Sequence, residues 1–171
     1  MRTRCKRPVR EPEYLGPMPL TDKSSLPSAL GRGATAGLAG TAVMTAFQKL
    51  VEMPLTGRGD SYAPADFTQK ILPVSPKSQQ ARQRLNYVAH FGIGTGWGVA
   101  YAIASRRGLE GQRAVAATFA AVYTGDVLLN TALGLYKPWE WSLKDTAIDV
   151  VDKLVQAEAA GAVFDAMGPS R

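Results

Sequence analysis

The stretch Gln112 to Tyr136, QRAVAATFAAVYTGDVLLNTALGLY, determines how the rest of the chain is interpreted. After Arg113 it contains one acid, Asp126, and otherwise only apolar, small or uncharged residues. At about 1.5 Å per residue, a helix of this length reaches across the roughly 30 Å hydrocarbon core of a bilayer. We therefore expect a membrane-spanning helix over residues 112–136.

Composition bounds the class of protein. The chain has 171 residues, 46% of them hydrophobic, with a net charge of +6 and a mean hydropathy of -0.09, which is ordinary for a soluble protein. The apolar residues are nevertheless concentrated in a few segments, and such segments are what a bilayer senses. Basic residues commonly fix the topology of membrane proteins, so we expect lipid and not nucleic acid as the partner. The single cysteine, Cys5, excludes an internal disulfide and argues against a metal site, and no cofactor is expected.

Three further segments have helical character. They cover residues 33–53, which end before Pro54, residues 86–105 and residues 142–167. Residues 1–32 are basic and proline-rich and are expected to form a disordered, flexible tail, and residues 54–85 a long connecting loop with two helical turns near residues 65–72. The predicted fold is all-α, a four-helix transmembrane bundle over residues 33–168.

Small residues recur on three of these segments at spacings that put them on one helix face. Flat faces of this kind let helix backbones approach closely in a membrane. The residues predicted to lie at helix contacts are Gly33, Gly37, Gly40, Gly94, Gly98 and Gly161.

The last helix limits the membrane interpretation. Asp149, Asp152, Lys153 and Glu158 lie within ten residues, and each costs about 2.5 to 3.5 kcal/mol at the centre of an isolated spanning helix. This helix can span only if its charged stripe faces other helices or water. The alternative is a soluble helical bundle that acts as an interaction module.

Orientation follows from the distribution of lysine and arginine between the two sides. If four helices span, 11 of these residues lie on the side of the termini and 7 on the other side, so both termini are predicted to be cytoplasmic. Residues 86–101 also match residues 149–164 at an offset of 63, with Gly98 opposite Gly161 and Tyr101 opposite Phe164. This match suggests two repeated helical hairpins.

With this orientation, polar residues gather toward the outer end of every helix. Ionisable groups inside a membrane are a functional-site hypothesis, here an outward-facing pocket that relays protons or binds a cation. The competing interpretation is that Asp149 and Lys153 neutralise each other and the rest make structural hydrogen bonds. The predicted polar cluster comprises Glu52, His90, Asp126, Asn130, Asp149, Asp152 and Lys153.

Three motifs together suggest a family. The small-residue first helix ending in Glu52-x-Pro54, the run from His90 to Gly98 and the WEW turn before an acidic last helix resemble the YagU-like group of small bacterial inner-membrane proteins of unknown function. The group's expected second histidine is Lys153 in this chain. The resemblance implies a multi-pass inner-membrane protein and supplies no activity.

No catalytic signature accompanies these motifs, because no nucleophile motif or zinc-binding motif is present, and an enzyme is not expected. The functions left open are a transporter-like protein, a stress-related protein, and a scaffold or accessory subunit. Flat glycine faces are also compatible with a homo-oligomer or a larger membrane complex.

Overall fold

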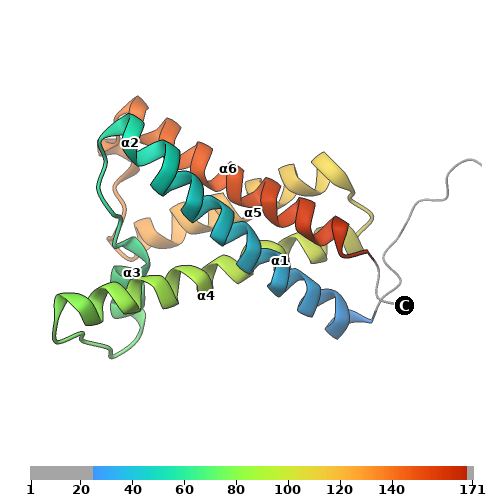
Figure 1. Ribbon diagram of the computed structural model, residues 1–171, viewed down its shortest axis with the longest axis horizontal. Helices are drawn as coiled ribbons and strands as arrows, with labels where there is room; N and C mark the ends of the chain where they lie inside the picture. The colour runs from blue at the N-terminus through green and yellow to red at the C-terminus, as the bar shows by residue number, and fades with distance from the viewer. Residues whose placement is uncertain (1–24, 169–171) are drawn as a thin grey trace, which may run out of the picture.

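Ser25 caps the first helix of the described residues, since its hydroxyl accepts a hydrogen bond from the Ser28 amide at 3.4 Å and Pro27 follows in the first turn. The computed structural model describes residues 25–168, and in this part of the chain all regular structure is helical (Figure 1). The elements in order are α1 (Leu26–Phe47), the π-helical turn η1 (Gln48–Glu52), α2 (Met53–Thr56), α3 (Ala63–Ile71), α4 (Gln79–Arg106), α5 (Gly111–Ala132), the 3-10 turn η2 (Pro138–Glu140) and α6 (Leu143–Ala166).

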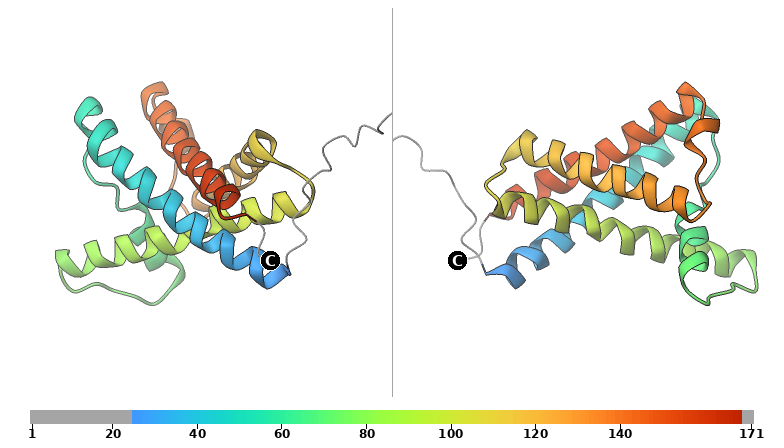
Figure 2. Two further views of the ribbon diagram at one scale, coloured as in Figure 1. Left: turned by 45° about the vertical axis from the view of Figure 1, so that its right-hand side comes forward. Right: turned by 180° about the vertical axis from the view of Figure 1, so that it is seen from behind.

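The long helices α1, α4, α5 and α6 run alternately up and down. The start of α1, the α4–α5 turn and the end of α6 lie at one end of the bundle, and α2, α3 and η2 lie at the other end (Figures 1 and 2). The bundle therefore has one end near both ends of the described chain and one end formed by the connecting segments.

Glycines set the distance between α1 and its neighbours. A Cβ atom on Gly33 would lie 2.7 Å from the Gly98 carbonyl oxygen, and one on Gly37 would lie 2.6 Å from the Thr95 carbonyl oxygen. A Cβ atom on Gly40 would lie 2.8 Å from the Gln156 carbonyl oxygen of α6. Helix α1 thus packs backbone to backbone against both α4 and α6.

The other three glycines predicted at helix contacts also lie there. Gly94 faces Thr41, Gly98 faces the Gly33 carbonyl, and a Cβ atom on Gly161 would lie 2.8 Å from the Tyr101 ring. Tyr101 and Phe164, which the proposed repeat places opposite each other, are both buried with ring centroids 5.3 Å apart. Large aromatic side chains thus pack in the core directly beside a glycine of the neighbouring helix.

Several predicted boundaries are wrong. Helix α1 begins at Leu26, so the predicted tail of residues 1–32 overlaps it, and residues 1–24 lie outside the described part. Arg32, expected in the tail, donates from Nη2 to the Phe164 carbonyl at 3.2 Å. The helical segment also does not stop at Pro54, because α1, η1 and α2 follow one another without a break and Pro54 lies in the first turn of α2.

Residues 54–85 are not an open loop. They contain α2 and α3, and α4 already begins at Gln79, where Ser78 Oγ accepts from the Ala81 amide at 3.1 Å. At the other end of the sequence, α5 stops at Ala132 and not at Tyr136, because Gly134 adopts φ 73° and ends the helix. The last helix, Leu143–Ala166, lies within the predicted residues 142–167.

Within residues 25–168, no helix has the combination of length and mean apolar character required to cross a membrane. The predicted spanning stretch, residues 112–136, is rich in alanine, threonine and glycine and includes Asp126, which lowers its average hydropathy. The structure shows the all-α bundle expected from the sequence and does not support its transmembrane character.

Candidate functional site

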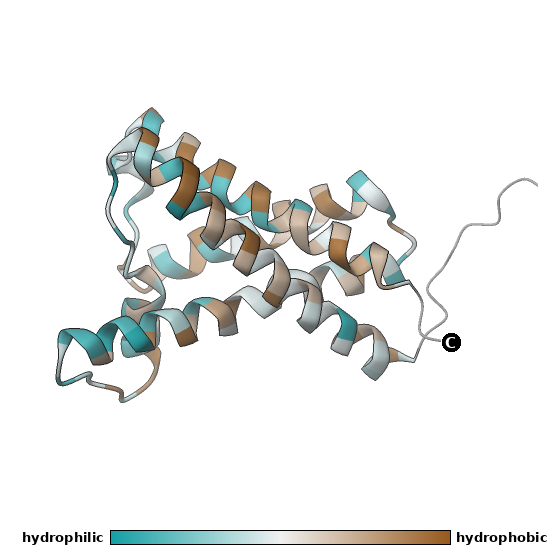
Figure 3. Ribbon diagram, in the orientation of Figure 1, coloured by the Kyte–Doolittle hydropathy of each residue, from teal (hydrophilic) through white to brown (hydrophobic). Residues whose placement is uncertain are grey.

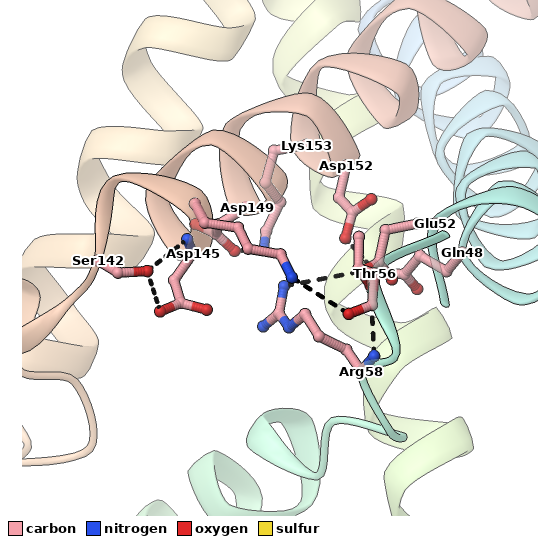
Figure 4. A network of polar contacts seen from close by, with 10 residues as sticks. Gln48, Glu52, Thr56, Arg58, Ser142, Asp145, Asp149, Asp152 and Lys153 are labelled. Carbon is pink, nitrogen blue, oxygen red and sulfur yellow. Dashed lines mark hydrogen bonds and ion pairs between the residues drawn. The ribbon is translucent and has the colours of Figure 1, made fainter. Parts of the chain in front are cut away.

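A pocket of about 340 Å³ lies at the end of the bundle formed by the connecting segments. Its walls come from the end of α1 and η1, residues 83–97 of α4, residues 122–130 of α5 and residues 149–156 of α6. Residues 58–64 close one side. Figure 4 shows Gln48 and Glu52 on one side of this region, with Asp149, Asp152 and Lys153 of α6 facing them.

The structure brings the whole predicted polar cluster together. Each of its members lines this one pocket, although they come from η1 and three long helices. They are Glu52, His90, Asp126, Asn130, Asp149, Asp152 and Lys153.

Amide and hydroxyl side chains link the helices around the pocket. Gln48 Nε2 donates to Asp152 Oδ2 at 2.7 Å, and Gln156 Nε2 donates to Thr41 Oγ1 at 2.8 Å, so α6 is bonded twice to the α1–η1 rod. Thr45 Oγ1 lies 3.1 Å from His90 Nε2 and joins α1 to α4. These contacts fix the relative positions of the pocket walls.

The π-helical turn η1 carries Gln48 and Glu52, which lie four residues apart and both line the pocket. The Met53 amide donates to the Gln48 carbonyl, five residues back, so this turn is wider than an α-helical turn. Glu52 is 9% exposed, and its Oε1 accepts from Thr56 Oγ1 at 2.7 Å. Turns of this kind are frequent at functional sites.

Most charges of the pocket are paired. Lys49 pairs with Asp60, Arg58 lies 3.9 Å from Glu52, and Lys153 lies 3.2 Å from Asp149. The last of these is the i to i+4 pair expected from the sequence. Three acids are thus each next to a base.

The two remaining acids of the pocket, Asp126 and Asp152, have only amide partners among the described residues. Asn130 Nδ2 donates to Asp126 Oδ1 at 2.9 Å, and Gln48 Nε2 donates to Asp152 Oδ2. Asp126 Oδ2 and Asp152 Oδ1, like the second oxygen of Asp149, are buried and have no hydrogen-bond partner in the described part of the chain. Asp152 is 5% exposed, so a spare carboxylate oxygen lies deep in the wall.

Residues 57–62, which we call the cover, follow α2; Gly57 has φ 72°, and residues 58–62 line the pocket. Asp60 holds this segment against η1 through Lys49, and its hydrogen bond and charge raise the pKa of Lys49. Asn86 of α4 donates from Nδ2 to the Ser61 carbonyl at 2.9 Å and accepts from the Ala65 amide at 3.1 Å. The cover is therefore anchored to both α1–η1 and α4.

Sequence reasoning missed the residues of the site that lie in the connecting segment and the neutral amides. Arg58, Asp60 and Tyr62 carry no motif, and Gln48 and Asn86 resemble ordinary helix-surface residues in sequence. Their spacing in the sequence could have identified them. Gln48 lies four residues from Glu52 and Asn86 lies four residues from His90, so each pair shares one helix face.

Among residues 25–168, no group of three or more histidine, cysteine, aspartate or glutamate side chains is arranged to hold a metal ion. The arrangement of the pocket fits a ligand that brings positive charge and hydrogen-bond donors.

Comparisons with protein-family models, with curated proteins and with solved structures find no match for this chain.

Proposed function

We propose that this protein is a small multi-pass membrane protein whose polar pocket, at the end of the bundle opposite the termini, binds a ligand. The bilayer is its main partner in this proposal. The observation that carries it is the chemistry of the outer faces of the four long helices.

Each long helix has a continuous range in which no exposed residue is charged. The ranges are residues 26–47 of α1, 85–105 of α4, 114–132 of α5 and 146–164 of α6, which we call the uncharged belt. Exposed residues of the belt include Leu38, Val43, Ile93, Leu128 and Leu154. In Figure 3 hydrophilic colours lie at the start of α4, near the helix ends and also at intervals along α6.

The belt has the dimensions of a bilayer. At about 1.5 Å per residue these ranges are about 28 to 33 Å long, close to the roughly 30 Å hydrocarbon core. A water-soluble helix normally places charged residues on its exposed face, so four uncharged faces of matching length favour a lipid environment.

Charged residues within the belt turn inward. They are buried or half-buried: Arg32, Asp126, Asp149, Asp152, Lys153 and Glu158. A hydropathy average over a whole helix counts these inward residues together with the outward ones. The belt describes only the outward surface, which is the surface that lipid contacts.

The proposal extends to location and role. The resemblance to the YagU-like group and the excess of lysine and arginine on the side of the termini support a bacterial inner-membrane protein with both termini in the cytoplasm. The pocket would then open outward. A transporter-like protein fits this arrangement best, with a stress-related protein and an accessory subunit of a larger complex or homo-oligomer as the other roles that the sequence allows.

A charge placed on the belt tests the proposal. Leu154 is 41% exposed near the middle of the α6 range, whereas Leu143 is 91% exposed and lies outside the belt. We expect Leu154→Arg to reduce the carbonate-resistant membrane fraction, because an arginine costs about 2.5 to 3.5 kcal/mol at mid-membrane, and Leu143→Arg to leave it unchanged. Two results together would favour the soluble interaction module. Carbonate would release the unaltered protein, and Leu154→Arg and Leu143→Arg would have the same free energy of unfolding.

A further inference from the structure

The charges of the pocket define the chemical class of its ligand. The pocket is lined by the acids Glu52, Asp60, Asp126, Asp149 and Asp152, and by the bases Lys49, Arg58 and Lys153. Each base has a carboxylate of its own, as described above. The carboxylates of Asp126 and Asp152 form no direct ion pair in the described part of the chain, although the charge of Lys153 acts on both.

The unpartnered oxygen of Asp152 indicates a ligand independently of the balance between acids and bases. Asp152 is 5% exposed, and while Gln48 serves its Oδ2, its Oδ1 is buried without a hydrogen-bond donor. A buried acceptor without a donor costs free energy, and more so for a charged group. A ligand that brings a donor to this atom removes the cost.

The shape and walls of the pocket select an organic cation over a bare ion. Its volume of about 340 Å³ is at the lower end of the range of small-molecule sites, and no set of side chains in residues 25–168 is arranged to hold a metal ion. Tyr87, Trp97 and Tyr136 line it. Aromatic faces attract ammonium and guanidinium groups and also bury an apolar body.

We propose that the pocket binds a small organic cation, a protonated amine with an apolar body, whose ammonium group donates to the free oxygen of Asp152 in a pocket that Asp126 also lines. This inference rests on the proposed function for the accessibility of the pocket. An ammonium group offers three hydrogen-bond donors, and Asp126, Asp149 and Asp152 each have one buried carboxylate oxygen without a donor in the described part of the chain. The remaining pairs of the pocket stay intact when it binds.

The experiment is a titration of the full-length protein in a non-ionic detergent, followed by calorimetry. The probes are benzylammonium, benzyl alcohol and benzoate, which share a ring and differ in charge. We expect benzylammonium to bind at least about tenfold more tightly than the other two, the factor that one charge-assisted hydrogen bond supplies. Equal binding of the three probes, tighter binding of benzoate, or no binding of any probe would overturn the proposal.

Variants localise the effect. Asp126→Asn and Asp152→Asn should each weaken benzylammonium binding at least about tenfold and leave benzyl alcohol binding unchanged. Glu140→Gln is the matched control, since Glu140 is exposed, pairs with Lys137 and lies outside the pocket. Each variant is compared at a temperature below its own unfolding midpoint, so that loss of folding is separated from loss of binding. Unchanged binding in both pocket variants contradicts the assignment.

The amine has two chemical sources, a soluble molecule or the headgroup of phosphatidylethanolamine. Competition between benzylammonium and a short-chain phosphatidylethanolamine, with short-chain phosphatidylglycerol as control, distinguishes them. Displacement by the first lipid alone assigns the site to a headgroup, and no displacement assigns it to a soluble amine; both support the cation class. Membrane extraction of the same preparation shows whether the proposed function fails separately.

Discussion

At the scale of single residues, the α1–α4 crossing depends on the absence of side chains. A Cβ atom on Gly98 would overlap the Gly33 carbonyl, whereas one on Gly96 of the same helix would meet nothing within 4 Å. We expect Gly98→Ala to lower the free energy of unfolding by about 1 to 3 kcal/mol, as overpacking does. Thermal unfolding in detergent measures the change.

Gly96→Ala is the control for this prediction. At an open helical position alanine is favoured over glycine by about 0.5 to 1 kcal/mol, so this variant should be as stable as the unaltered protein or more stable. Equal effects of the two substitutions would mean that α1 and α4 do not cross where the structure places them.

Asn86 is a second residue with a defined structural role. It accepts from the Ala65 amide, and Ala65 is fully buried, so Asn86→Ala leaves that amide without its partner. Unmet buried donors cost about 1 to 3 kcal/mol. We expect faster hydrogen exchange over α3 in this variant and no change in Gln80→Ala, a nearby exposed position. Exchange over α3 that stays slow in Asn86→Ala would contradict this role.

At the scale of elements, the cover formed by residues 57–62 is expected to open when its ion pair is removed. Lys49→Gln or Asp60→Asn should raise hydrogen exchange in this segment, with little effect on the unfolding midpoint because exposed pairs contribute little stability. The raised pKa of Lys49 means that the pair is intact below the ordinary lysine pKa of about 10.5 and is lost as the pH rises through the raised value.

The matched control is Lys137→Gln, which removes a similar exposed pair with Glu140 outside the pocket. It should leave exchange in residues 57–62 as it was. If Lys49→Gln and Lys137→Gln behave alike, the cover is not held by Lys49 and Asp60.

The helices that pack inside the bundle were predictable from the sequence. The segments that extend outside the bundle were not. Residues 112–136 and 142–167 showed their helical character because apolar and small residues recur along them. Gln79–Leu85 begins α4 without such a pattern, since this part extends past the bundle and only the cap at Ser78 marks its start. The prediction that the helix ends before Pro54 was wrong because a proline disrupts the interior of a helix but is tolerated in a first turn.

The polar cluster was predictable for a related reason. An ionisable residue within an apolar helix must turn inward, so residues at similar depth on different helices converge on one site. Neutral residues such as Gln48 carry no such constraint, and the connecting segment with Asp60 is placed by tertiary contacts that no local pattern records. The charged residues of the site could thus be predicted from the sequence. Its amide side chains and its cover could not.

For the whole molecule, an outward-opening pocket requires that a bilayer surround the uncharged belt. The most direct measurement is cysteine accessibility in intact bacterial cells, with Cys5 replaced by serine and single cysteines placed at Ser75, Arg107 or Leu143. All three positions are exposed, with Ser75 and Leu143 at the pocket end and Arg107 at the end where α1 begins. A membrane-impermeant maleimide is predicted to label Ser75→Cys and Leu143→Cys in intact cells and Arg107→Cys only after the cells are broken. If none of the three is labelled until the cells are broken, the outward-opening pocket in a membrane bundle is contradicted.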